Sequence, residues 1–378
     1  MDAKHMAGTH WIDDPAELSR RLACCSDRAG LDRVGLDTEF IRERTYWPQL
    51  ALVQVSTGED ILLVDMLVPG MPAALASLLR DASVSKIMHS ASEDLVALQH
   101  ACGCVPKPLF DTQIAAALCG VGAGMGYQRL VSDLLGIAVD KGETRSDWMR
   151  RPLSPQQLDY AADDVRHLFA LHDQLDARLE TLGRGDWLRE DCARLVDAAD
   201  AGGEDPWPHL ALRAAQFLDA DAQRRLLRLL RWRETQARAG DRPRNWILDG
   251  ELAVLLAKNP PADADALRRL LESRPKSPLR LSNAIWDALS TPLADEATMP
   301  LARDDEGDRK TLRRLQDAVA ERSRELALPD GVLASRRWLQ ALLEQKQWPP
   351  MLAGWRRGQL EPVLAPLLAA DAGKPATA

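Results

Sequence analysis

The stretch RVGLDTEFIRERTYWPQLALVQVSTGEDILLVDM, residues 33–66, decides the fold of this chain. It holds three short β-rich runs, 33–40, 50–56 and 60–66, and their spacing is typical of a β-meander. The first run places Asp37 and Glu39 in an otherwise apolar strand, where an ionised carboxylate is costly unless another charge compensates it. The stretch therefore predicts a sheet, and it raises the question of what compensates these two acids.

Strand and helix patterns alternate after this meander. The patterns predict strands over 84–89 and 108–111, and helices over 71–82, 90–102, 112–120, 127–136 and 154–183. In the last of these helices Ser154 and Pro155 stand where an N-cap and a first helical residue belong. Strands that alternate with helices after a meander indicate an α/β domain whose mixed sheet continues with parallel strands.

The chain beyond the Gly/Pro/acid-rich linker at 200–209 shows helical patterns and almost no β-rich runs. Two helical units are expected there, separated near residues 290–308. No apolar run approaches the roughly 18 residues of a membrane span. The first residues lack the apolar core of a secretory signal, and the scattered cysteines suit a reducing compartment. We therefore expect a cytoplasmic protein that does not engage a membrane.

The net charge of −8 is distributed unevenly, because the chain is acidic through residue 205 and mildly basic beyond it. An acidic domain suits a polyanionic partner only if metal cations neutralise its carboxylates. The basic part could contact phosphates, although solvated helical faces explain the same charges equally well.

Three pairs of polar residues carry the candidate chemistry. Asp37 and Glu39 are two apart on a strand, so their side chains leave the same face. Asp94, with Glu93 before it, opens a helix, and Tyr160 and Asp164 are four apart on another helix. Each pair alone has an ordinary structural explanation. Together they predict carboxylates that converge on two Mg²⁺ or Mn²⁺ ions, an arrangement that hydrolyses phosphodiesters.

The order of these motifs resembles the ribonuclease D family. The stretches GLDTEFIRERTYWPQLALVQVS, HSASEDL, LFDTQIAAAL and KGETRSDWMRRPLSPQQLDYAADDV carry the resemblance through most of residues 30–180. The family comprises 3′→5′ exoribonucleases of the DEDD superfamily, in its tyrosine branch. The resemblance implies a ribonuclease H-like exonuclease domain over residues 1–203.

The resemblance also implies the roles of the site residues. The four carboxylates would be metal ligands and catalytic groups, and the tyrosine would orient the attacking water or help to take its proton; these residues are Asp37, Glu39, Asp94, Asp164 and Tyr160. Glu93 has no family counterpart. The implied substrate is RNA with a free 3′ end, such as the single-stranded 3′ tail of a transfer-RNA precursor, and the implied product is a nucleoside 5′-monophosphate.

A second resemblance concerns the helical part. Residues 206–292, with LRWRE and ILDGELAVLLA, are similar to the HRDC module that helicases share with ribonuclease D. Residues 300–372 resemble a more divergent copy. The tryptophans spread through both units favour a helical core over base-stacking platforms. Nothing in the sequence implies an oligomer.

Five further residues are candidates for RNA contact. Phe40 follows the acidic pair and could contact a base or belong to the core. Lys141, Arg145 and Trp148 lie in a polar loop before the last helix of the site, where cations could hold phosphates. Gln54 is polar within an apolar strand, and either a base contact or a buried polar role fits it.

Two alternatives to the exoribonuclease remain at this point. One is a DNA 3′→5′ exonuclease of the same branch. The other is a non-catalytic RNA-binding adaptor built on a degenerate nuclease, although such a protein would usually have lost a carboxylate.

Overall fold

A mixed six-stranded sheet forms the centre of the amino-terminal part. The computed structural model describes residues 8–29, 31–139, 142, 146–203, 205–302 and 306–372. The strands lie in the order β1-β4-β3-β2-β5-β6. Their bounds are Thr9–Ile12 for β1, Arg33–Ile41 for β2, Gln49–Ser56 for β3, Ile61–Asp65 for β4, Ser85–Met88 for β5 and Leu109–Asp111 for β6.

The predicted meander is confirmed, since β2 pairs antiparallel with β3, and β3 with β4. The strands that follow are parallel, β5 to β2 and β6 to β5, as expected. Strand β1 was not predicted; it is four residues long and pairs parallel with β4. A strand this short carries too little periodicity to be recognised locally.

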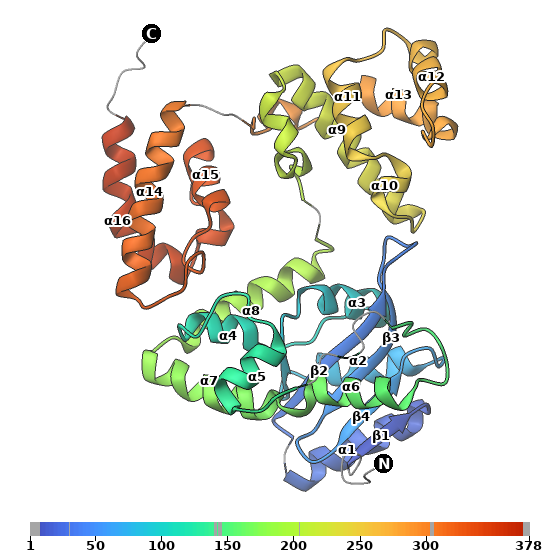
Figure 1. The fold of residues 1–378 in the computed structure, drawn as a ribbon, viewed down its shortest axis with the longest axis vertical. Helices are drawn as coiled ribbons and strands as arrows, with labels where there is room; N and C mark the ends of the chain where they lie inside the picture. The colour runs from blue at the N-terminus through green and yellow to red at the C-terminus, as the bar shows by residue number, and fades with distance from the viewer. Residues whose placement is uncertain are drawn as a thin grey trace.

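Helices cover both faces of the sheet (Figure 1). One face packs against the helices that precede or follow β1, β4 and β5, namely α1 (Pro15–Ala29), α2 (Met71–Arg80) and α3 (Ser92–Cys102). The other packs against α4 (Thr112–Leu118), α5 (Tyr127–Leu135), α6 (Pro155–Arg166) and α7 (Leu168–Leu182). Helix α8 (Gly185–Asp200) contributes side chains to both cores. Helices α1 and α8 were not predicted.

The long helix predicted over 154–183 is interrupted. Its start is as expected, because Ser154 and Gln157 form a capping box. At His167 the backbone leaves the helical region, with φ −104° and ψ 3°, and this residue separates α6 from α7. The hydroxyl of Tyr127 occupies the break, accepting from the His167 N–H at 3.1 Å and donating to the Asp163 carbonyl at 2.9 Å. The interruption thus depends on a tertiary contact that helical periodicity does not reveal.

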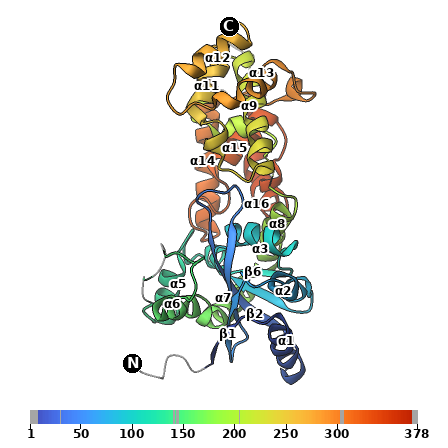
Figure 2. The ribbon, with the colours of Figure 1, turned by 90° about the vertical axis from the view of Figure 1, so that its right-hand side faces the viewer.

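The rest of the chain is helical and lies at one end of the sheet domain (Figures 1 and 2). The first unit comprises η1 (Pro208–Ala211), η2 (Arg213–Phe217), α9 (Ala220–Ala239), α10 (Arg244–Ile247), α11 (Gly250–Lys258), α12 (Ala264–Glu272), η3 (Leu279–Leu281), α13 (Ser282–Ser290) and η4 (Glu296–Thr298). The second comprises α14 (Glu306–Glu325), α15 (Arg336–Gln345), η5 (Pro350–Leu352) and α16 (Trp355–Ala372).

The two helical units attach differently to the sheet domain. The first unit has its own apolar core. The core of the second unit is continuous with the one beneath α4, α7 and α8. Trp355 is buried there and stacks on Trp187 of α8, with ring centroids 4.3 Å apart. Trp246 in the first unit departs from the expected core role, because it is 58% exposed. Among the described residues, no helix combines the length and apolar character that crossing a bilayer requires.

Candidate active site

Strand β2 and helix α6 bring three carboxylates together. Asp37 and Glu39 project from the same face of β2, and α6 packs across β2, β3 and β4 on that face. Asp164 therefore meets the two strand acids. Carboxylate oxygens of the three residues all lie within 4.8 Å of one another, as the strand alternation and the helix position predicted.

Asp94 reaches the same region from the opposite face of the sheet. It stands in the first turn of α3 and is 9% exposed. The hydroxyl of Thr38 donates to its Oδ1 at 2.5 Å. Asp94 lies outside the tight group of three but is close enough to raise the pKa of Asp37. We call Asp37, Glu39, Asp94 and Asp164 the acidic cluster.

Sequence reasoning missed Thr38. The residue between two acids of one strand face must point to the other face, and this alternation was the available signal. Glu93, by contrast, points to the guanidinium of Arg42, 3.0 Å away. Its salt bridge directs it to the rim of the site, whereas Asp94 is directed inward.

Burial raises the pKa of every acid in the acidic cluster, and repulsion from other members adds to it at Asp37 and Glu39. Burial, followed by the charges of Asp94, Asp164 and Glu39, raises the pKa of Asp37 well above its usual value. Burial and the other acids raise the pKa of Glu39 to about 9. Burial also raises the pKa of Asp164 to about 7 and that of Asp94 to about 6. Such shifts indicate that the folded chain holds more negative charge here than it can compensate alone.

The donor set fits divalent metal ions. Among the described residues, no lysine or arginine forms an ion pair with Asp37, Glu39 or Asp164. Carboxylate oxygens are the ligands that Mg²⁺ and Mn²⁺ prefer, and a bound cation would favour the ionised form of each acid. Within the described part of the chain no side chain supplies the charge that the β2 acids require, and the donor set is consistent with a metal ion in that role.

Tyr160 stands one helical turn before Asp164. Burial, then the charges of Asp164, Glu39 and Asp37, raise the pKa of its phenol above the ordinary value. A hydrogen bond from Tyr160 lowers the pKa of Asp164, which partly offsets the effect of burial. The tyrosine is consequently a neutral donor at pH 7 and not a proton-abstracting base.

The candidates for RNA contact separate into different environments. Phe40 packs against the core on the α1–α3 face, away from Asp37 and Glu39. Trp148 is 3% exposed and packs near Tyr160, with ring centroids 6.1 Å apart. Its indole therefore belongs to the core beside Tyr160 and is not free to contact RNA. Lys141 and Arg145 lie outside the described residues.

Gln54 is fully buried directly opposite Asp37 in the β2–β3 pairing. The two side chains therefore share the face that α6 covers. Both amide atoms of Gln54 lack a hydrogen-bond partner among the described residues. Its burial opposes direct contact with a base.

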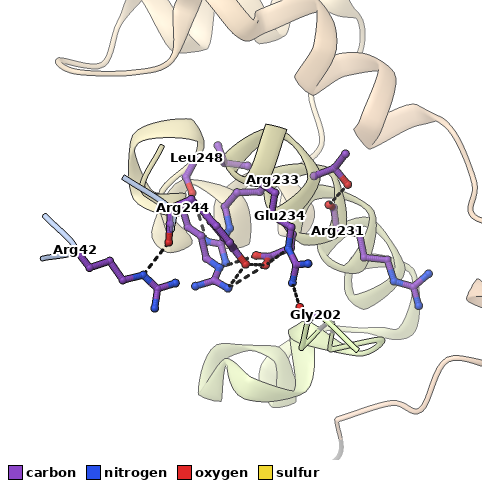
Figure 3. A network of polar contacts seen from close by, with 10 residues as sticks. Arg42, Gly202, Arg231, Arg233, Glu234, Arg244 and Leu248 are labelled. Carbon is purple, nitrogen blue, oxygen red and sulfur yellow. Dashed lines mark hydrogen bonds and ion pairs between the residues drawn. The ribbon is translucent and has the colours of Figure 1, made fainter. Parts of the chain in front are cut away.

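The loop after β2 is hydrogen-bonded to the first helical unit (Figure 3). Arg42 donates to the carbonyl of Tyr46 at 2.8 Å and pairs with Glu93. The Tyr46 hydroxyl donates to Glu234 of α9, and Arg244 of α10 donates to the same carboxylate at 2.5 and 2.9 Å. The rim of the site thus includes contacts from a separate part of the chain.

Comparisons with known proteins agree with this arrangement. A family model described as a 3′–5′ exonuclease matches residues 9–180. Ribonuclease D of Xanthomonas oryzae is 60% identical over 96% of this chain and 99% of its own length. Ribonuclease D of Gluconacetobacter diazotrophicus is 38% identical over 86% of this chain and 84% of its length.

Among solved structures, the crystal structure of Escherichia coli RNase D, described as an exoribonuclease involved in structured RNA processing, matches with a TM-score of 0.80. It is 29% identical and covers 96% of this chain and 99% of that one. The match confirms the expected fold class, an exonuclease domain with a mixed sheet followed by a helical region. The chain belongs to the ribonuclease D family of 3′–5′ exonucleases.

Proposed function

We propose that this protein is a metal-dependent exoribonuclease that removes nucleoside 5′-monophosphates one at a time from the 3′ end of RNA. The observation that carries the proposal is the convergence of carboxylate oxygens of Asp37, Glu39 and Asp164 within 4.8 Å of one another, with no ion pair to any of them among the described residues. Family membership supplies the direction of hydrolysis and the preference for RNA.

Two Mg²⁺ or Mn²⁺ ions fit the proposal, and the four acids of the acidic cluster would hold them. Bound ions would activate water as the nucleophile and stabilise the charge on the leaving 3′ oxygen. Asp37 is the natural shared ligand, because the charges of all three other acids act on it. Asp94, steadied by the Thr38 hydroxyl, would complete one ion's shell from the far side of β2.

Tyr160 would contribute by position. Its hydroxyl is a neutral donor beside Asp164, so it can orient a water molecule against the scissile phosphate. It need not take up the proton at the start of the reaction, since its pKa is raised.

The substrate that fits best is a single-stranded 3′ tail on a structured RNA, such as a transfer-RNA precursor in the cytoplasm. The E. coli relative is described as acting in structured RNA processing, which supports this substrate class. We assign residues 1–203 to catalysis, and residues 206–292 and 300–372 to two HRDC-like units that contact the body of the RNA. The mildly basic character of the chain beyond residue 205 supports that division.

End-labelled RNA and DNA of one sequence, incubated with Mn²⁺, with Mg²⁺ and with excess EDTA, test the proposal. We expect stepwise loss of RNA nucleotides from the 3′ end with metal and none in EDTA. Equal hydrolysis of both polymers would favour the DNA exonuclease. Metal-independent RNA binding without hydrolysis would favour the adaptor.

A further inference from the structure

Asp111 is a buried carboxylate that belongs to neither the acidic cluster nor a salt bridge among the described residues. It ends β6, is 1% exposed and is surrounded by backbone N–H groups. Its Oδ1 accepts from Gln113 at 2.8 Å and Ile114 at 3.1 Å, which caps α4. The same carboxylate also accepts from Ser90 at 3.2 Å and Ala91 at 2.8 Å. One side chain therefore joins the start of α4 to the turn between β5 and α3.

That turn requires support. Ser90 has φ 58°, in the left-handed region that is strained for a non-glycine residue. The N-cap of α3, Ala91, has no side chain able to cap the helix. Thr112 adds a second attachment, because its hydroxyl lies 3.2 Å from the Met88 carbonyl and 2.9 Å from the His89 ring. Strain at Ser90 is thus maintained by contacts from the start of α4.

The turn leads directly to Asp94. Asp94 follows Ala91 by three positions, within the first turn of α3, so a shift of the turn displaces the carboxylate. On the other side Asp94 is held by Thr38 alone among side-chain donors in the described chain.

We propose that Asp111 is a positioning residue that holds the turn of Ser90 and Ala91 and thereby places Asp94 against the metal site. The inference rests on the proposed function, because it concerns one ligand of that site. Asp37, Glu39 and Asp164 come from β2 and α6, whereas the described hydrogen bonds of the Asp111 carboxylate go to the turn of Ser90 and Ala91 and to the start of α4. The position of Asp94 should therefore depend on Asp111 while the group of three does not.

The chemistry demands a carboxylate. All four partners are N–H donors, and an ionised carboxylate is purely an acceptor. An asparagine of the same shape would turn an NH₂ group toward at least one of these donors. Asp111→Asn thus removes a buried acceptor with little change in volume.

The test is calorimetric titration of the full chain with Mn²⁺, with circular dichroism and melting in EDTA as folding controls. Partners that orient metal ligands typically contribute about 10- to 100-fold in affinity. We expect Asp111→Asn to weaken one ion by that factor and to leave the other unchanged. The matched control is Asp191→Asn, which also removes a buried carboxylate, 9% exposed, but one that accepts from Arg194, Trp355 and Arg356 and not from the turn of Ser90 and Ala91; it should leave both ions unchanged.

Two changes at Ser90 separate the turn from the α4 cap. Ser90→Gly in the Asp111→Asn background should recover much of the lost affinity, since glycine adopts a positive φ without strain. Ser90→Val, which strains the turn but leaves Asp111 intact, should weaken the same ion even if Asp111→Asn does not fold.

The possible failures are distinguishable. If Asp111→Asn and Ser90→Val both bind two ions as the parent does, the inference is wrong and the proposed function stands. If the parent chain binds no Mn²⁺, the proposed function is wrong and the inference is lost with it. Equal weakening of both ions would also overturn the inference, because it would indicate general loosening of the site.

Discussion

The acidic cluster and the carboxylates at the two domain contacts are built from the same residue types but differ in what surrounds them. Asp191 of α8 is buried and accepts from the Arg356 guanidinium at 2.5 and 2.7 Å, from Arg194 at 3.0 Å and from the Trp355 indole at 3.1 Å. It fastens the second helical unit to the sheet domain. In the acidic cluster Asp94 is as buried as Asp191, and Asp37, Glu39 and Asp164 are half-buried, yet among the described residues these last three have no cationic partner.

Glu234 repeats the paired arrangement at the first helical unit. Burial acts to raise its pKa, but hydrogen bonds from Arg244, Tyr46 and Arg238 outweigh that effect and lower the pKa to about 2. The shifts in the acidic cluster have the opposite sign. The comparison teaches that buried acids with the same chemistry differ in their pKa according to whether the fold brings a guanidinium to them, as at Glu234, or brings further acids, as at Asp37 and Glu39.

Asp37→Asn should have the largest effect, and it tests most directly the contrast between the acidic cluster and the paired acids. Removing the acid on which all the others act should abolish metal binding and RNA hydrolysis. It should also raise the melting temperature in EDTA, because it relieves repulsion in a buried cluster. Mn²⁺ titration, melts in EDTA and single-turnover rates on a short RNA measure this. Retained binding of two ions would show that Asp37 is not their shared ligand.

Tyr160→Phe should distinguish the proposed metal ligands from a neighbouring group that affects turnover without binding metal. The change keeps the ring that packs near Trp148 and removes only the hydroxyl. Loss of one positioned proton donor or acceptor typically lowers a rate by about 10²–10⁴-fold. We expect turnover to fall within that range while Mn²⁺ affinity stays at the parent value. Parent turnover in this variant would remove Tyr160 from the reaction.

Asp191→Asn should lower the stability of the fold, whereas Asp37→Asn should raise the stability of the metal-free protein. Breaking a buried ion pair from one side typically costs about 3–5 kcal/mol, here because Arg356 would remain buried without its anion. Urea unfolding and limited proteolysis of residues 306–372 should both detect a loosened second unit. Glu361→Gln, which removes an exposed partner of Arg357 on the same helix, is the matched control and should change far less. Equal effects of the two would mean that Asp191 does not fasten α16.

We expect the smallest of these effects in the pH dependence of stability, where the acidic cluster and the paired acid Glu234 should act in opposite directions. Because the folded-state pKa values of Glu39 and Asp164 are raised to about 9 and about 7, the metal-free protein should lose stability as pH rises from about 5 to 9. Mn²⁺ should restore more stability at pH 8 than at pH 6, since its ligands must be ionised.

Glu234 should act at the other end of the pH scale. Its depressed pKa contributes stability that is present above about 4.5 and is lost as pH falls toward about 2. Thermal melts in EDTA between pH 3 and 9, for the parent and for Glu234→Gln, measure both the loss of stability at high pH and the loss at low pH. Stability of the metal-free protein that rises from pH 5 to 9 would contradict the assignment of uncompensated charge to the acidic cluster.

The amino-acid sequence by itself determined the meander, the face shared by Asp37 and Glu39, and the N-cap at Ser154 that starts α6. These features follow from strand alternation, helical spacing and cap chemistry, which act over a few neighbouring residues. The motifs were also sufficient to place the chain in its family, because the order of the acids reflects the order of the elements that carry them.

Only the tertiary structure decided which buried acids find a partner. Asp191 and Arg356 are 165 positions apart, and Asp111 accepts from a turn 20 and 21 positions before it. The break at His167 depends on a hydroxyl from α5, and the exposure of Trp246 depends on how α10 packs. Contacts at such separations leave no periodic trace in the sequence, because they are set by how whole elements pack and not by the conformational preferences of neighbouring residues.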